Sequence, residues 1–197
     1  MKKWLIPVII IVGVILIGVF WSVGIQNSAV EKSQAVSKAW GNVNTSYQRR
    51  NDLIGNLVRT VEGAANFEKS TLTAVTEARA KATSVQVDPT NITPEQLEKF
   101  NSAQGGVSSA LSRLLVSVER YPTLQSNQNF LRLQDELAST ENEIRTARVR
   151  FNESVEAYNN HILRFPNKMF LSGYKEKPYF NAVEGAETPE KVEFNIQ

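Results

Sequence analysis

Residues 47–58 read YQRRNDLIGNLV, and positions 47, 50, 54 and 57 are spaced by three and four residues in turn. Such spacing places side chains along one side of an α-helix and predicts a long amphipathic helix. Arg50 occupies one of these apolar positions. A buried arginine destabilises a fold unless a carboxylate and further hydrogen bonds offset its desolvation. The pattern therefore predicts a partner for Arg50 on a facing helix.

The apolar seam continues in both directions from this stretch. Gly63 and the following AANFEKST interrupt it, which predicts a turn or kink at that point. The alternation of four and three residues is the heptad period of packed helices. The seam consists of Val36, Trp40, Val43, Tyr47, Arg50, Ile54, Leu57, Val61 and Ala64.

Three further amphipathic helices are predicted after this turn, over residues 68–83, 94–121 and 130–165. Thr93, followed three positions later by Gln96, is a capping signal for the start of the second of these. The last two end before a proline, which cannot continue a helix. Four amphipathic helices with short connections can bury their apolar faces, or stripes, only against one another. The predicted fold is therefore all-α, an antiparallel up-and-down four-helix bundle.

The N-terminus carries the longest apolar run. Residues 4–25, WLIPVIIIVGVILIGVFWSVGI, contain no charged side chain, and about 20 apolar residues suffice for a helix to cross the bilayer core. Trp4 and Trp21 suit the headgroup regions at its two ends. We expect a retained, single transmembrane helix in contact with the lipid bilayer. The alternative is a cleaved signal peptide, which the small residues Ser22 and Gly24 leave open, although its apolar region is usually only ~7–15 residues long.

The C-terminal residues 167–197 lack helical periodicity but keep several aromatic side chains. An extended tail packed on the bundle fits them better than disorder. The predicted organisation is an anchor over residues 1–27, a bundle domain over 28–166 and this tail over 167–197. The aromatic side chains of the tail are Phe170, Tyr174, Tyr179, Phe180 and Phe194.

Charge and composition exclude several classes of function. The formal net charge is +2 and the charges are interspersed, so the sequence predicts no nucleic-acid partner. The chain has no cysteine, which excludes disulfides, thiolate catalysis and cysteine-ligated metals. Lys2 and Lys3 precede the apolar run, whereas Glu31, Lys32 and Lys38 follow it. This bias favours a cytoplasmic N-terminus and a bundle on the extracytoplasmic side.

Nothing in the sequence points to catalysis. Phosphate-loop and nucleophile-elbow motifs are absent, and His161, the only histidine, lacks the partners of a zinc or di-iron motif. We expect His161 to be a surface residue. Carboxylates such as Glu119, Glu136, Glu141 and Glu143 could form an acid and base pair only in a cleft that separates their pKa values, so structural salt bridges are favoured. We therefore expect no enzyme activity, no cofactor and no metal site.

Two carboxylates are candidate partners for Arg50: Glu119 and Glu141. Glu141 and Asn142 lie at the edge of the last stripe, and Arg148 follows two turns later. We hypothesise that these five residues form a polar network that fixes the register of the bundle, because buried polar groups are best attested in that role. The alternative is that the network lines a site for a ligand or partner.

Several segments together resemble the LemA family. They are YQRRNDLIGNLV, ERYPTL from Glu119, NFLRLQDEL from Asn129, TENEIRTARVRFN from Thr140, YNNHILRFP from Tyr158, KPYF from Lys177 and PEKVEF from Pro189. The resemblance implies a bacterial protein of the cell (inner) membrane, with an N-terminal anchor and an up-and-down four-helix domain. It implies no known activity. Gly55 stands where the family often has proline, and Phe151 where it often has tyrosine.

These features lead us to expect a scaffold or interaction protein that holds a partner at the membrane. The partner suggested by the resemblance is a membrane protease or a phosphatase-like protein. A ligand-sensing bundle similar to receptor sensor domains is the first alternative, and a hydrolase is the second. The sequence leaves open the identity of the partner and the oligomeric state.

Overall fold

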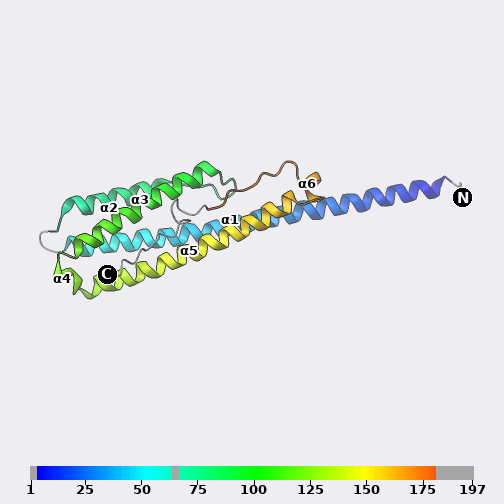
Figure 1. The fold of residues 1–197 in the computed structure, drawn as a ribbon. Helices are drawn as coiled ribbons and strands as arrows, with labels where there is room; N and C mark the ends of the chain where they lie inside the picture. Colours follow the sequence, from blue (N-terminus) through cyan, green and yellow to red (C-terminus); the bar gives the residue numbers. More distant parts are fainter. Residues whose placement is uncertain (1–3, 64–66, 181–197) are drawn as a thin grey trace, which may run out of the picture.

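The computed structural model describes residues 4–63 and 67–180, and all its regular elements there are helices. The prediction of an all-α chain is thereby confirmed. Ala64 and Phe194, named above, lie outside the described residues. The helices are α1 (Leu5–Glu62), α2 (Lys69–Ser84), α3 (Pro94–Val118), α4 (Pro122–Gln125), α5 (Gln128–Leu163) and α6 (Asn167–Phe170), shown in Figure 1.

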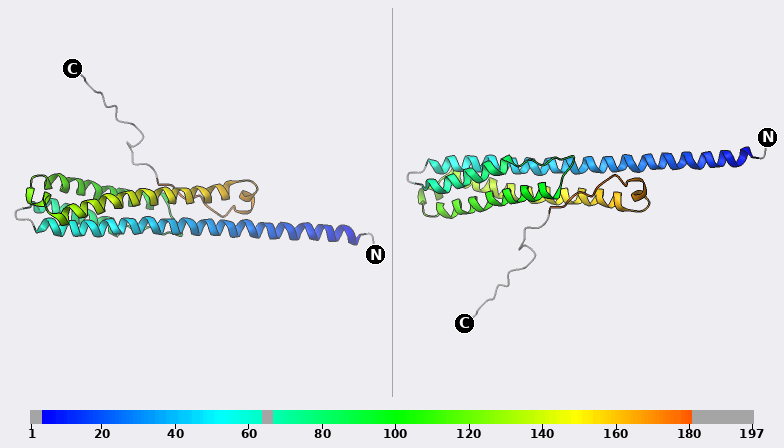
Figure 2. Two further views of the ribbon diagram at one scale, coloured as in Figure 1. Left: turned by 90° about the horizontal axis from the view of Figure 1, so that it is seen from below. Right: turned by 90° about the horizontal axis from the view of Figure 1, so that it is seen from above.

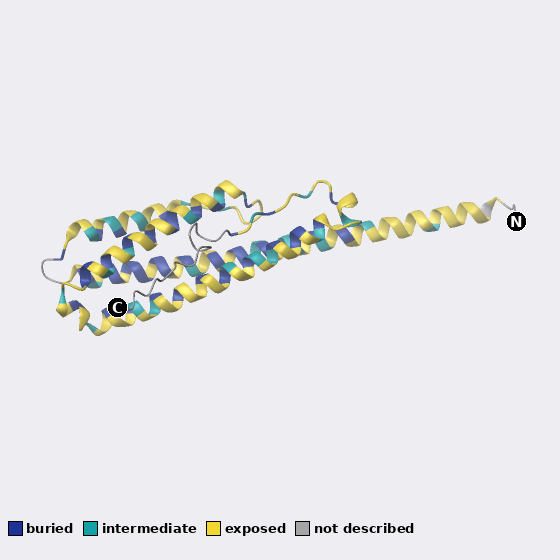
Figure 3. Ribbon diagram, viewed as in Figure 1, coloured by how far each residue is buried: buried dark blue, intermediate teal, exposed yellow. Residues whose placement is uncertain are grey.

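Helix α1 is one uninterrupted helix of 58 residues. It projects far beyond the other helices toward the N-terminus (Figure 2). It crosses the predicted anchor boundary at residues 27 and 28 without a break. Its projecting part exposes apolar side chains, and burial begins at Ile25 (Figure 3). A single rod thus carries both the apolar run and the seam around Arg50.

The long helices α1, α2, α3 and α5 lie side by side and alternate in direction (Figure 1). Helix α1 packs chiefly on α5, and α2 packs on α3. We call these helices, without the part of α1 before Ile25, the helical body. Every described member of the seam in α1 is buried, Arg50 included. The heptad period therefore identifies the side of α1 that faces the other helices.

Helix α3 begins where the capping signal predicts. The Thr93 hydroxyl accepts a hydrogen bond from the Gln96 backbone N–H at 3.3 Å, and the Gln96 side chain accepts one from the Thr93 N–H at 3.2 Å. The two bonds satisfy the backbone N–H groups of Gln96 and Thr93 at the start of the helix. The helix ends at Val118, three residues before the predicted end at Tyr121.

The structure differs from the sequence prediction in two short helices. Helix α4, with Pro122 at its first position, forms a turn between α3 and α5, because proline is pre-organised for a helix start. Helix α6 lies in the segment 167–197, which was expected to lack helical structure, and α5 ends at Leu163 rather than at 165. Beyond α6, residues 171–180 form no helix and bury Leu171 and Phe180 in the body.

Candidate functional site

A groove with a volume of about 650 Å³ opens between α1, α3 and α5. The α3 side is lined in part by the small residues Ser102, Gly105 and Ser108, which leave room between α3 and α5. Arg50 lies at its floor. The other lining residues are Tyr47 from α1, Pro94, Leu97, Glu98, Asn101 and Gln104 at or in α3, Glu141, Ile144 and Arg148 from α5, and Pro178 and Tyr179 from the segment after α6.

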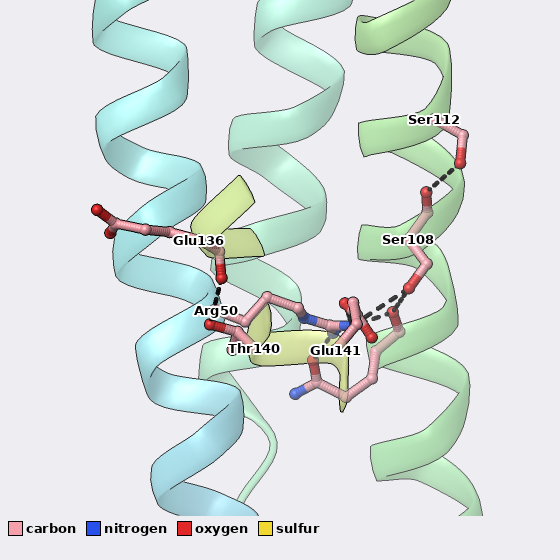
Figure 4. A network of polar contacts seen from close by, with 7 residues as sticks. Arg50, Ser108, Ser112, Glu136, Thr140 and Glu141 are labelled. Carbon is pink, nitrogen blue, oxygen red and sulfur yellow. Dashed lines mark hydrogen bonds and ion pairs between the residues drawn. The ribbon is translucent and has the colours of Figure 1, made fainter. Parts of the chain in front are cut away.

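Arg50 is 3% exposed, and its guanidinium joins three helices. Nη1 donates to Glu141 Oε1 at 3.0 Å and to Ser108 Oγ at 3.3 Å. Nη2 donates to the side-chain oxygen and to the backbone carbonyl of Gln104. Figure 4 shows Arg50 reaching from α1 toward Ser108 on α3 and Glu141 on α5. The guanidinium also lies 4.9 Å from the centre of the Tyr47 ring, a cation–π distance.

The ion pair between Arg50 and Glu141 is buried at one end only. The Arg50 side chain is 3% exposed, whereas that of Glu141 is 49% exposed. The charge of the arginine is therefore balanced without full desolvation of the acid, which avoids much of the penalty of a fully buried pair. Arg50 Nε is buried and has no hydrogen-bond partner among the described residues.

The structure brings three of the five predicted network residues to the groove. Arg50 and Glu141 pair directly, and Arg148 lines the same groove with its guanidinium 4.7 Å from the centre of the Phe180 ring. Glu119 does not belong to this network. It is the exposed C-cap of α3, eleven residues after Ser108, and thus roughly 16 Å further along the helix axis.

Asn142 also lies outside the network. It is exposed, and its backbone carbonyl accepts a hydrogen bond from the Thr146 hydroxyl at 2.9 Å. It lines a different hollow, together with Glu143 and Arg150. The physical reason is rotation about the axis of α5: adjacent residues of a helix lie about 100° apart, so Glu141 and Asn142 cannot face the same groove.

Gln104 is a groove residue that the sequence analysis missed. It occupies an apolar stripe position in α3 and is buried. A glutamine in an apolar stripe is the same kind of signal as Arg50 in α1, and these two irregularities meet in space. A polar residue in each of two stripes is therefore the sequence pattern that identifies this contact.

Tyr47 forms the wall of the groove beside Arg50. Burial raises the pKa of its hydroxyl above the ordinary value, while the positive charges of Arg148 and Arg50 oppose this shift. The hydroxyl is therefore neutral at physiological pH, and the charged side chains that line the groove are two arginines, Arg50 and Arg148, and two glutamates, Glu98 and Glu141.

A second polar set holds the segment after α6 against α5. The Asn159 amide donates to the Lys177 carbonyl at 2.9 Å, and the Lys177 N–H donates to the Asn159 side-chain oxygen at 2.9 Å. Asn152 forms the same reciprocal pair with the backbone of Phe180, at 3.0 and 2.8 Å. The two asparagines are seven residues apart, which places them on one face of α5. This asparagine clamp, Asn152 and Asn159, positions Pro178 and Tyr179 at the end of the groove.

Replacing Asn159 by alanine is expected to loosen the clamped segment. The Lys177 N–H and carbonyl would both lose their partner, which destabilises local structure by about 1–2 kcal/mol. Trypsin should therefore cleave after Lys175 faster than in the unchanged chain, as followed by mass spectrometry. The control is Asn160→Ala, because Asn160 is exposed. Equal cleavage rates in the two variants would contradict the role of the clamp.

His161 is partly buried and is not the surface residue expected. Its Nε2 lies 3.1 Å from the Ile25 carbonyl of α1, and its Nδ1 lies 3.3 Å from the Asn167 amide. It thus links the end of α5 to α1. Within residues 4–63 and 67–180, no three side chains of histidine, aspartate or glutamate are arranged to hold a metal ion.

Fold and site together define an all-helical protein in which one long N-terminal helix has an exposed apolar part before Ile25 and a longer part packed in the helical body. By length and composition, α1 is also the one helix in the described part of the chain that is suited to cross a membrane. The chain belongs to the LemA family, whose model matches residues 39–194. The resemblance found in the sequence is confirmed.

Curated relatives have similar sequences over most of this chain. Magnetosome proteins MamQ 1 and MamQ 2 of Paramagnetospirillum magneticum are 29% identical over 182 residues, which cover 83% of this chain and 67% of each relative. Magnetosome protein MamQ of Magnetospirillum gryphiswaldense is 29% identical over 75% of this chain and 61% of the relative. Protein LemA of Metamycoplasma hominis is 25% identical over 77% of this chain and 67% of the relative.

Proposed function

We propose that this protein is a membrane-anchored, non-catalytic scaffold. In this proposal α1 crosses the cell membrane once through residues 4–25 and continues as the first helix of a four-helix bundle that binds a partner protein. The observation that carries the proposal is the continuity of α1 from Leu5 to Glu62. A rigid helix shared by the membrane span and the body holds the body at a fixed place beside the bilayer, which suits a protein that positions others.

The anchor is supported by the exposed side chains of α1. Its projecting part exposes isoleucine, valine, leucine and phenylalanine side chains that no described residue covers. Exposed apolar surface of this extent is unfavourable in water and favourable in lipid. Lys2 and Lys3 lie just before the span, and positive charges at this position support a cytoplasmic N-terminus and an extracytoplasmic body.

The groove between α1, α3 and α5 is the proposed binding site for the partner. It combines apolar lining with the Arg50 network at its floor, a mixture typical of recognition sites. The relatives in magnetic bacteria are named for the magnetosome and not for a reaction, which fits a binding role. We propose a membrane protease or a phosphatase-like membrane protein as the partner, following the family resemblance.

A ligand-sensing function is the second candidate, and the chemistry of the groove favours it. Arg50 and Arg148 bring two guanidinium groups to the groove beside the Tyr47 ring, and guanidinium groups bind carboxylates. A thermal shift with small carboxylic acids tests this function. Capture of a membrane protein by chemical cross-linking in mild detergent tests the scaffold instead. The absence of any thermal shift would contradict the sensing function, and the absence of any captured membrane protein would contradict the scaffold.

The anchor predicts the behaviour of the protein on membrane extraction. It should stay in the membrane fraction after alkaline carbonate and keep its N-terminus, because residues 4–25 are long enough to span. Val14→Arg should weaken this retention, since arginine at the centre of a span disfavours insertion by about 2.5–3.5 kcal/mol. Val30→Arg, in the exposed part of α1 beyond the span, is the control. Release as a shortened soluble chain would rule out the anchor.

The groove predicts opposite results for two adjacent glycines. Gly105 lines the groove, Gly106 does not, and a Cβ atom at either position meets no atom within 4 Å. Gly105→Tyr should fill the groove and abolish capture of the partner, whereas Gly106→Tyr should leave capture unchanged. Both variants should fold, because glycine inside a helix is destabilising by roughly 0.5–1 kcal/mol relative to alanine. Equal capture by both variants, measured by cross-linking and mass spectrometry, would show that the partner binds elsewhere.

A further inference from the structure

The turn between α5 and α6 exposes an apolar cluster at one end of the body. Phe165 is 78% exposed and Met169 is 70% exposed, and Leu163 and Phe170 are also exposed. We call these four side chains the apolar turn. Large apolar side chains grouped on a surface mark a site of contact with another protein or with a membrane.

The apolar turn is held at a defined level of α1. Phe170 packs edge-on against Trp21, with ring centres 6.0 Å apart. His161, two residues before Leu163, contacts the Ile25 carbonyl through Nε2 at 3.1 Å. Figure 1 and Figure 3 show α6 at the end of the body where the exposed part of α1 begins. The turn therefore lies beside residues 21–25 of α1.

This level coincides with the edge of the bilayer that the proposed anchor requires. A helix rises 1.5 Å per residue and the hydrocarbon core is roughly 30 Å thick. A span that begins at Trp4 thus leaves the core about 20 residues later, between Trp21 and Ile25. Tryptophan favours this interfacial zone. The apolar turn is consequently at the depth where a lipid headgroup region would meet the body.

The charges of the turn also suit a membrane surface. Residues 157–175 contain no aspartate or glutamate, whereas Arg164 and Lys168 are exposed within the turn and Lys175 follows it. Basic side chains near a bilayer are attracted to anionic lipid headgroups. Apolar side chains flanked by basic ones are the composition of segments that lie in the interface.

We propose that residues 163–170 form a second membrane contact, in which the apolar turn enters the interfacial region of the bilayer beside α1. The inference rests on the proposed transmembrane anchor and adds to it. A single helix would leave the body free to tilt and to turn about the bilayer normal. A second contact, fixed to α1 through Trp21 and Ile25, restricts both motions and sets which side of the groove faces the partner.

The absence of cysteine makes a direct depth measurement possible. Met169→Cys, Val12→Cys and Thr123→Cys each introduce one thiol for a fluorescent probe, in the turn, in the span and in α4 at the far end of the body. The full chain is reconstituted into phosphatidylglycerol and phosphatidylethanolamine vesicles that contain nitroxide lipids, with the spin label either near the headgroup or deep in the acyl chain. All three side chains are exposed, so the probe should not disturb packing.

The expected result is loss of most of the fluorescence at position 169 with the shallow nitroxide, loss at position 12 with the deep nitroxide, and no loss at 123. Adding Arg164→Glu and Lys168→Glu should reduce the quenching at 169 without changing that at 12. Quenching at 12 with none at 169 would overturn the second contact and leave the anchor standing. Absence of quenching at both positions would overturn the anchor and, with it, this inference.

Discussion

Replacing Trp40 by alanine is expected to lower the free energy of unfolding by about 3–5 kcal/mol. The Trp40 side chain is 4% exposed and touches three aromatic rings. Its ring centre lies 5.1 Å from that of Phe100 in α3, 5.7 Å from that of Phe151 in α5 and 5.8 Å from that of Phe180. Alanine would leave a cavity where α1, α3, α5 and the clamped segment meet, and neighbouring side chains can close such a cavity only in part.

The measurement is denaturant unfolding, followed by circular dichroism, of a chain that begins at Gly24. Beginning there removes residues 4–23 of the apolar run but keeps Ile25, which is buried in the body. Phe165→Ala is the control because this aromatic side chain is exposed, and surface changes usually stay within about 0.5 kcal/mol. If Trp40→Ala lowers the free energy of unfolding as little as Phe165→Ala does, the aromatic cluster around Trp40 is not part of the stable core.

Arg50→Ala is expected to destabilise the same chain by about 2–4 kcal/mol, because it leaves a cavity and deprives Gln104 and Glu141 of their hydrogen bonds. A pair buried at both ends would suggest a larger loss, about 3–5 kcal/mol. Glu141 is half exposed, so water can solvate its carboxylate when the arginine is removed. Arg49→Ala is the matched control: its ion pair with Glu143 is exposed on both sides and should contribute only about 0–1 kcal/mol.

Double-mutant cycles separate the two candidate carboxylates. The coupling energy between Arg50 and Glu141 should lie in the range of about 0.5–3 kcal/mol found for residues in contact. Glu119 is distant from Arg50, so the losses of unfolding free energy caused by substituting each residue should add to within about 0.5 kcal/mol. Equal and small effects at Arg49 and Arg50 would mean that Arg50 is solvated. A variant Arg50→Ala that stays stable but no longer captures the partner would assign Arg50 to binding rather than to stability.

The sequence identified the elements of the fold because the signals that define them are local. The seam from Val36 to Val61, the capping box at Thr93 and the prolines after α3 and α5 each act within a few residues along the chain. A periodicity of three and four residues fixes which side of a helix is buried, whatever it packs against. The buried position of Arg50 follows from this rule, whereas the exposed apolar part of α1 was predicted from the length of its uncharged run.

The sequence was less informative about short elements and polar contacts. Helices α4 and α6 have four residues each, too few for a periodic pattern. The asparagine clamp escaped prediction because asparagine is common in exposed turns, and nothing local indicates that Asn152 and Asn159 bind a backbone segment. The position of His161 against the Ile25 carbonyl likewise depends on residues 136 positions apart in the chain.

What the sequence by itself determined is therefore the helical nature of the chain, the buried face of each long helix and the length of the apolar run. Only the tertiary structure decided that Arg50 pairs with Glu141 rather than Glu119, that Asn142 faces away, and that the apolar turn lies beside Trp21. The physical reason is that helical periodicity constrains rotation about one axis. The axial offset between two helices is set by how their side chains interlock across the interface, and no short stretch of sequence contains that information.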